Sequence, residues 1–168
     1  MQPTPDRDNP QPMLTPDLSD PLPALLDSER DALIARIVER VSHEIPDYAT
    51  APPAVVTARF TAIVDDMIRS LIARDPSHLT NLLERTTRKR LAQGYTIHAL
   101  IIAANIVSEV ASEMIRRRMA ADPEQQTIAL RRVNNLISIG RSVMSRCHLD
   151  VVVNQIPQRR SSAQDVGD

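Results

Sequence analysis

The side chains best suited to binding a metal ion are four histidines and one cysteine: His43, His78, His98, His148 and Cys147. Zinc sites place such ligands at short, regular spacings, as in HxxxH or HExxH, because several ligands must reach one ion. These residues do not have that spacing. Cys147 and His148 are adjacent, so their side chains diverge on a helix. The sequence therefore predicts no metal site.

Two glutamates could act together on one helix. Glu109 and Glu113 are four residues apart, which places them on the same helical face. Di-iron bundles combine such acids with a Glu-x-x-His motif, which this sequence lacks, so a solvated face pairing with Arg116 and Arg117 is the favoured interpretation. The chain also has no nucleophile elbow, phosphate-binding loop or dinucleotide-binding glycine motif. We expect no catalytic residues and no enzyme activity.

Two polar residues in a strongly apolar stretch are candidates for ligand contacts or for polar positions in the core. His98 could sense pH or bind haem, but a haem pocket usually needs an aromatic wall. The chain has only Tyr48, Phe60 and Tyr95, so a partly exposed histidine is favoured and no cofactor is expected. Asn105 must find hydrogen-bond partners if it is buried. It would either fix the helix register or line a ligand cavity.

The composition indicates helices. Hydrophobic residues make up 42% of the 168 residues and aromatic residues only 2%. The core must therefore consist of Leu, Ile, Val, Ala and Met, which pack well between helices, whereas strands more often use aromatic residues. The three glycines are too few for an all-β fold with many tight turns. We expect an all-α fold.

Start and stop signals divide the chain into five main helices. Ser28 and Asp31 resemble a capping box, Pro46 ends the first apolar stripe, and a loop to Pro52 follows. Gly94 suits the position after a helix C-terminus. The fourth helix is apolar nearly all round from Ile97 to Val107 and should be central. The expected helices start at Ser28, near Pro53, at Asp75-Pro76, after Thr96 and at Asp122-Pro123, the last running to about Ile156.

Both ends are expected to be disordered. Seven of the thirteen prolines lie within the first 23 residues, together with several acids. We expect a disordered arm over residues 1–24, a helical domain over 25–156 and a disordered tail over 157–168. The N-terminus lacks the features of a signal peptide, and Ile97–Val107 is too short to span a bilayer. A cytoplasmic protein without membrane association is predicted.

The charge pattern argues against nucleic acid as a partner. The formal net charge is −1, so no bulk field favours phosphate. The later half is Arg-rich, and the cluster of Arg85, Arg88, Lys89 and Arg90 could contact phosphate. Without interleaved aromatic residues or a helix-turn-helix, a solvated face is the favoured interpretation.

A ridge of small and aliphatic residues follows the fifth helix, and it is a candidate interface. Gly140 within a helix costs about 1 kcal/mol relative to alanine, so a packing reason is expected. One possibility is close approach of a second copy in a homodimer. The other is packing against the domain's own central helix. The candidate interface consists of Val133, Leu136, Gly140, Val143 and Cys147, with Ala129 on the same ridge.

Two motifs resemble a known family. Glu44, Pro46 and Tyr48 form an E-x-P-x-Y element after the first helix, and Ala92 and Gly94 precede an aliphatic helix that begins at Ile97 and includes Leu100 and Ile101. This pattern is similar to the helical N-terminal sensory domains of stressosome RsbR-type proteins, especially the RsbRD-like N-terminal domain, which is also found ahead of PucR-type transcription regulators. The resemblance covers about residues 28–150.

The resemblance implies a globin-like or bundle-like helical fold, usually without haem and often dimeric, that passes a signal to an output domain. The sequence departs from it at Ala104, Asn105 and Val107, where the family commonly has aromatic residues. About eighteen residues follow Asp150, too few for an output domain. We therefore expect a stand-alone regulatory module that dimerises and docks on a protein partner of unknown identity. The alternatives are a small-molecule sensor with an apolar pocket near His98 and Asn105, and an Arg-rich nucleic-acid-associated protein.

Overall fold

The computed structural model describes residues 20–164, and the side chains of residues 20–154, as a set of α-helices without strands. The all-α prediction is confirmed for this part of the chain. The helices are α1 (Pro21–Ser28), α2 (Arg30–Glu44), α3 (Pro46–Ala49), α4 (Pro53–Ala73), α5 (Ser77–Ala92), α6 (Ile97–Arg118) and α7 (Pro123–Gln164).

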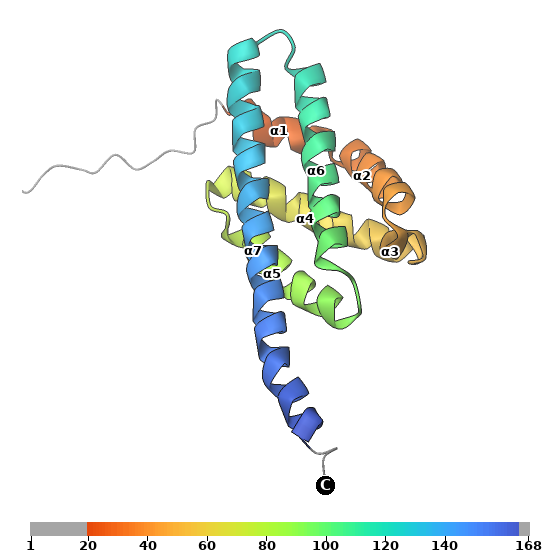
Figure 1. Cartoon of the computed structure of the whole chain (residues 1–168). Coiled ribbons are helices and arrows are strands. Elements are labelled where there is room, and N and C mark those ends of the chain that lie inside the picture. Colours follow the sequence, from red (N-terminus) through yellow and green to blue (C-terminus); the bar gives the residue numbers. More distant parts are fainter. Residues whose placement is uncertain (1–19, 165–168) are drawn as a thin grey trace, which may run out of the picture.

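An antiparallel pair of long helices organises the fold. Figure 1 shows α6 and α7 side by side, with α4 crossing behind them and α2 beside α6. Helix α5 packs against both α4 and α7. One continuous apolar core joins these helices, with Phe60, Met67, Ile106 and Ile115 among its most deeply buried side chains. As predicted from its apolar surface, α6 lies inside the domain, packed between α2 and α7.

Local start and stop signals act largely as expected. The Thr96 hydroxyl accepts a hydrogen bond from the Ala99 amide at 3.0 Å, and the Asp122 carboxylate accepts one from the Gln125 amide at 3.0 Å. Helix α5 begins at Ser77, one residue later than expected, so Pro76 and not Asp75 holds the N-cap position, although the Asp75 carboxylate accepts a hydrogen bond from the Ser77 amide at 2.9 Å. Gly94 has φ +89°, the left-handed conformation that glycine adopts without strain, and it ends α5.

Two short helices make the count seven in the described residues, where five main helices were expected. The predicted capping box at Ser28 does not form, because Ser28 is the last residue of α1 and its hydroxyl donates to the Leu25 carbonyl at 2.8 Å. Helix α1 forms because Leu22 and Leu26, four residues apart, are both buried in the core. Helix α3 lies within the predicted loop and buries Tyr48.

The predicted ends of the domain also change. Helix α1 begins at Pro21, so residues 21–24 are helical and do not belong to a disordered arm. Asp20 caps this helix by accepting from the Leu22 amide at 3.2 Å, and it also pairs with Arg132 of α7. Helix α7 continues to Gln164, well into the predicted tail. The remaining parts of the two segments, residues 1–19 and 165–168, lie outside the described residues.

By length and composition alone, α6 could cross a membrane. Its most apolar window has a mean hydropathy of 1.3, and half of that window is buried inside the fold. The core helix of a folded domain has the same properties, and α6 buries Ile106, Val107 and Val110 against its neighbours. This apolar surface is therefore accounted for by packing between helices.

Candidate functional site

The two polar residues singled out in the apolar helix do not form a site together. His98 is exposed on the first turn of α6. Asn105 is half-buried, and its side-chain oxygen accepts a hydrogen bond from Arg141 of α7 at 2.8 Å. Asn105 therefore links α6 to α7 through this hydrogen bond. Neither residue lines the pocket described next.

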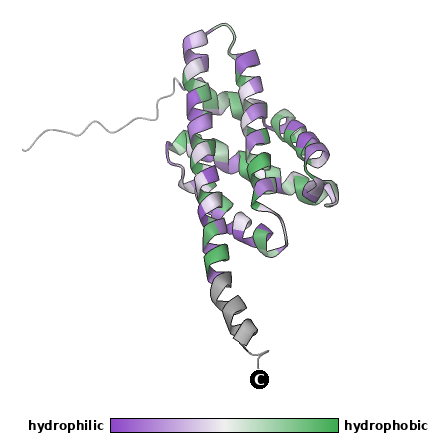
Figure 2. Cartoon of the chain, in the orientation of Figure 1, coloured by the Kyte–Doolittle hydropathy of each residue, from purple (hydrophilic) through white to green (hydrophobic). Residues whose placement is uncertain are grey.

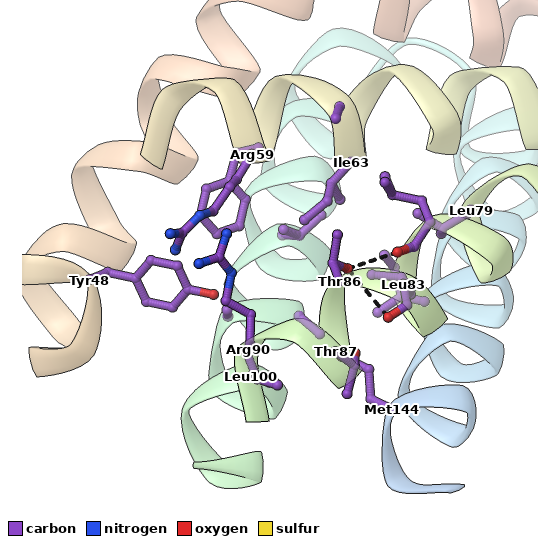
Figure 3. A pocket seen from close by; sticks show the side chains of 17 residues that line it. Tyr48, Arg59, Ile63, Leu79, Leu83, Thr86, Thr87, Arg90, Leu100 and Met144 are labelled. Atoms are coloured by element: carbon purple, nitrogen blue, oxygen red, sulfur yellow. Dashed lines mark hydrogen bonds between the residues drawn. The ribbon is translucent and has the colours of Figure 1, made fainter. Parts of the chain in front are cut away.

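An apolar pocket lies between α4, α5 and α6, and it also touches α7. The volume of this pocket is about 100 Å³. An engineered cavity of about 150 Å³ with similar aliphatic walls is known to bind benzene, so the space is of a size that small apolar groups can use. Figure 3 shows the lining side chains. The walls include Ile63 of α4, Leu79 and Leu83 of α5, Leu100 and Ala104 of α6, and Met144 of α7.

The three aromatic residues of the chain meet at one end of this pocket. The ring centroid of Tyr48 lies 5.6 Å from that of Phe60 and 5.5 Å from that of Tyr95. The interplanar angle between the two tyrosines is 68°, an edge-to-face arrangement that the charge distribution of aromatic rings favours. Tyr48 is buried, and burial raises the pKa of its hydroxyl to about 12.

Two arginines cover this aromatic cluster. The guanidinium carbon of Arg59 lies 5.8 Å from the Tyr48 ring centroid and 5.5 Å from that of Tyr95, and Arg90 also lies 5.5 Å from Tyr95. Arg59 donates a hydrogen bond to the Tyr95 hydroxyl at 3.0 Å. Figure 3 shows the guanidinium groups of Arg59 and Arg90 close to each other, with Arg59 over the Tyr48 ring and the hydroxyl end of Tyr48 beside the Arg90 side chain. The pocket thus has a cationic end and aliphatic walls.

These two arginines are close to each other and have no acidic partner within residues 20–154. Among the described residues, neither has a carboxylate within salt-bridge distance, whereas Arg30 and Arg40 elsewhere in the domain both pair with acids. The Nε of Arg59 is buried and has no hydrogen-bond acceptor in the described part of the chain. Burial, and then the positive charge of Arg59, lower the pKa of Arg90. Two neighbouring cations without a counter-charge can accept an anion.

The family motifs position this cluster. Glu44 ends α2 and pairs with Arg40 at 2.6 Å, and Pro46 starts α3, which carries Tyr48 into the core. After α5, the amide of Gly94 donates to the Leu91 carbonyl and that of Tyr95 to the Arg90 carbonyl, at 3.1 and 3.0 Å. This pattern is a Schellman motif, and it turns Tyr95 back toward Arg90. Sequence reasoning missed the cluster, although the scarcity of aromatic residues and the position of Tyr48 and Gly94 in two motifs were its available signals.

The predicted interface ridge packs inside the domain. Val133, Leu136, Val143 and Cys147 are between 0% and 6% exposed, and Gly140 is also buried. A Cβ at position 140 would lie 2.6 Å from Cδ1 of Leu83 on α5. The ridge is therefore covered by the chain's own helices, as in the second of the two interpretations, although its partner includes α5 and not only the central helix.

The remaining candidate residues are not brought together in the described part of the chain. The described residues contain no group of three or more histidine, cysteine or acidic side chains that could hold a metal ion. Two members of the basic cluster on α5 have different surroundings: Arg88 pairs with Glu84 and with Asp150 of α7, while Arg90 lines the apolar pocket.

Comparison with known proteins places the chain in a family. Residues 31–159, from α2 into α7, match the family model described as the RsbT co-antagonist protein rsbRD N-terminal domain. No curated protein and no solved structure matches the chain. The family is one of regulatory, stressosome-associated signalling domains and is not a known enzyme family. The chain therefore belongs to the family of RsbT co-antagonist protein rsbRD N-terminal domains, as its motifs predicted.

Proposed function

We propose that this chain is a non-enzymatic regulatory module of the cytoplasm that self-associates and docks on a partner protein through the projecting end of α7. Family membership supports a signalling role. The observation that carries the proposal is that α7 continues past the other helices, as Figure 1 shows.

Three of the four exposed large aliphatic side chains that are described on α7 lie toward this end, and the fourth, Ile128, lies near its start. Leu149 is 61% exposed and Val153 60%, with Val152 beside them at 40%. Figure 2 shows this hydrophobic stretch just before the grey end of the helix. Because Leu149 and Val153 are four residues apart, they lie on one face of α7. Covering such side chains removes apolar surface from water, at about 25 cal/mol per Å².

A second copy of the chain is the occupant that we propose for this face. Two copies of a projecting helix can bury the same aliphatic face against each other about a two-fold axis, because a face that is complementary to itself closes a dimer. The dimer would then present one composite surface to the partner protein. The ridge at Gly140 is not needed for this contact, because it is already covered by α5.

Light scattering across a dilution series tests this proposal. The wild type should show a mass above 18.7 kDa that falls on dilution. Leu149→Gln combined with Val153→Gln should give a folded monomer. Ile72→Gln is the matched control, because Ile72 is 65% exposed on α4, far along the chain from the projecting helix, and this variant should associate like the wild type. A mass of 18.7 kDa for the wild type at every concentration would contradict self-association.

Docking is tested with the same variants. A partner retained by immobilised wild type from a lysate of the source cells should also be retained by Ile72→Gln. It should be lost with the α7 double variant. Equal retention by all three proteins would show that the partner binds elsewhere.

The pocket favours a second candidate function, a small-molecule sensor. The pocket lies beside α6, where the sequence predicted one, but Tyr48 and Arg59 line it and His98 and Asn105 do not. It also touches Ile137 and Met144 of α7, the helix that projects. An occupant would therefore contact the element that carries the proposed interface.

A neutral ligand tests whether the pocket binds anything. Saturation-transfer NMR should detect 1-hexanol bound to the wild type. Ala62→Leu and Ala104→Leu each place a larger side chain in the wall, and each should abolish the signal in a protein that still melts cooperatively. A signal that persists in both variants would place the binding outside this pocket.

A further inference from the structure

We propose that the pocket between α4, α5 and α6 binds a small amphipathic carboxylate, with the charged group at Arg59 and Arg90 and the aliphatic part against the apolar walls. This inference rests on the second candidate function, since it names the chemical class of the ligand that the sensor would take.

The first observation is the division of the pocket into two chemically different parts. Ile63, Leu83, Ala104 and Met144 supply aliphatic surface without charge. Thr86, which also lines the pocket, directs its hydroxyl to the carbonyl of Leu82 at 2.8 Å, so its hydrogen is used within its own helix. An uncharged, aliphatic group of a ligand fits this part, because burying it costs no hydrogen bond.

The second observation is the pair of guanidinium groups at the other end. A guanidinium offers a planar fork of donors that matches the two oxygens of a carboxylate. Arg59 and Arg90 approach from different helices, α4 and α5, and among the described residues their side-chain partners are neutral: Arg59 donates to the Tyr95 hydroxyl and Arg90 to the Gln93 amide oxygen. A monoanion placed between them would supply the missing counter-charge in a setting where water is partly excluded.

The third observation is an unpaired donor. Arg59 has one nitrogen, Nε, that is buried without an acceptor in the described residues, while its Nη1 donates to Tyr95. A buried donor without a partner is unfavourable, and a ligand oxygen can satisfy it. The hydroxyl end of Tyr48 lies beside the Arg90 side chain in Figure 3, and it keeps its proton at neutral pH because burial raises its pKa to about 12. It adds another donor for an anion.

The alternative is that the arginines have a structural role alone. Each lies over an aromatic ring, and such cation–π contacts stabilise a fold without any ligand. That role would give a pocket that binds apolar molecules irrespective of their charge. The two possibilities therefore differ in one measurable quantity, the preference among ligands of equal shape and different charge.

Three six-carbon ligands measure this preference at pH 7.5. Hexanoate carries a negative charge, 1-hexanol carries none, and hexylamine carries a positive charge. In competition by saturation-transfer NMR with full-length protein, hexanoate should bind at least tenfold more tightly than 1-hexanol, and hexylamine should bind more weakly than both. The preference for hexanoate should fall as salt is added, because salt screens the attraction.

Variants of the two arginines assign the preference to them. Arg90→Gln and Arg59→Gln should each reduce the ratio of hexanoate to hexanol affinity by at least fivefold while binding of hexanol persists. Arg90→Lys keeps the charge but loses the fork, so its ratio should lie between those of the wild type and Arg90→Gln. The matched control is Arg85→Gln, an exposed position on the same helix outside this pocket, which should keep the wild-type ratio.

The outcomes separate the two proposals. Equal affinities for the three ligands in the wild type, lost in Ala62→Leu and Ala104→Leu, would leave the apolar sensor standing and overturn the anion site. An unchanged ratio in Arg90→Gln and Arg59→Gln would also overturn it. Absence of binding by all three ligands would overturn both proposals. Hexanol binding serves as the folding control, so a variant that merely unfolds is recognised because it loses hexanol as well.

Discussion

Leu83 of α5 occupies the space beside Gly140 of α7 that any side chain at position 140 would need. A Cβ there would lie 2.6 Å from Cδ1 of Leu83, closer than carbon atoms approach without displacement. Glycine is unfavourable in a helix by about 1 kcal/mol relative to alanine, and this close approach of α5 accounts for its presence. The smooth ridge of α7 thus serves the domain's own core.

A large residue at this position should therefore destabilise the fold and leave self-association unchanged. Gly140→Leu should lower the free energy of unfolding by about 1–3 kcal/mol, the usual cost of overpacking, partly offset by better helix propensity. Urea denaturation followed by circular dichroism measures this change. Leu83→Ala in the same chain should recover part of the loss by freeing space. A stable, monomeric Gly140→Leu protein would instead indicate an intermolecular role for the ridge.

The start of the domain offers a second prediction. Leu22 lies in a Pro-rich segment, yet it is 1% exposed. Leu22→Ala should cost about 2–5 kcal/mol, as for other buried leucines, because a cavity remains in the core. Leu25→Ala, at a half-buried position on the same helix, should cost less. If Leu22→Ala and Leu25→Ala both left the melting temperature unchanged, α1 would not contribute to the core.

Tyr48 should make the fold sensitive to alkali. Its pKa is raised to about 12 in the folded protein and is about 10 in an unfolded chain. The folded state therefore holds the proton more tightly, so this contribution to stability is fully present below pH 10 and is lost between pH 10 and 12 as the pH rises. Two pKa units correspond to about 3 kcal/mol.

An absorbance titration at 295 nm measures this pKa directly. Tyr95→Phe leaves Tyr48 as the only tyrosine, and the chain has no tryptophan. The folded variant should titrate near pH 12, or unfold as it does so, whereas the same variant in urea should titrate near pH 10. Coincident titrations of the folded and urea-unfolded protein would contradict the burial of Tyr48.

The contact between α2 and α4 should be sensitive to acid. Arg30 holds Asp65 through two hydrogen bonds, Nε to Oδ1 at 2.6 Å and Nη2 to Oδ2 at 3.0 Å. The hydrogen bonds from Arg30 lower the pKa of Asp65. This contribution to stability is therefore present above the unfolded value of about 3.9 and is lost as the pH falls through the lower folded pKa.

Asp65→Asn should accordingly be less stable than the wild type at pH 7, and the difference should close as the pH falls below about 3.9. Urea denaturation midpoints of the two proteins at several pH values measure this difference in stability. Asp66→Asn is the control, because Asp66 pairs with Arg69 of its own helix and should matter less. A stability difference that stays constant down to pH 2 would show that the ion pair with Arg30 does not lower the pKa of Asp65.

Sequence by itself determined the helical class and most helix ends. Thr96, Asp122, Pro53 and Gly94 act through atoms within a few residues of themselves, so their effects do not depend on the rest of the fold. The two family motifs also lie in short segments, and they indicated the family that the wider match shows. The short helix α1 was missed because its prolines and acids suggested disorder, while the burial of Leu22 and Leu26 depends on distant helices.

Tertiary structure alone decided which faces meet. Arg59 and Tyr95 are 36 residues apart, and only the packing of α4 against the end of α5 brings them within hydrogen-bond distance. The spacing along α7 placed Gly140 on an apolar ridge but could not say whether α5 or a second copy covers it, because both would bury the same surface. Periodicity defines the apolar face of a helix, whereas the identity of its neighbour is set by the joint packing of all the helices.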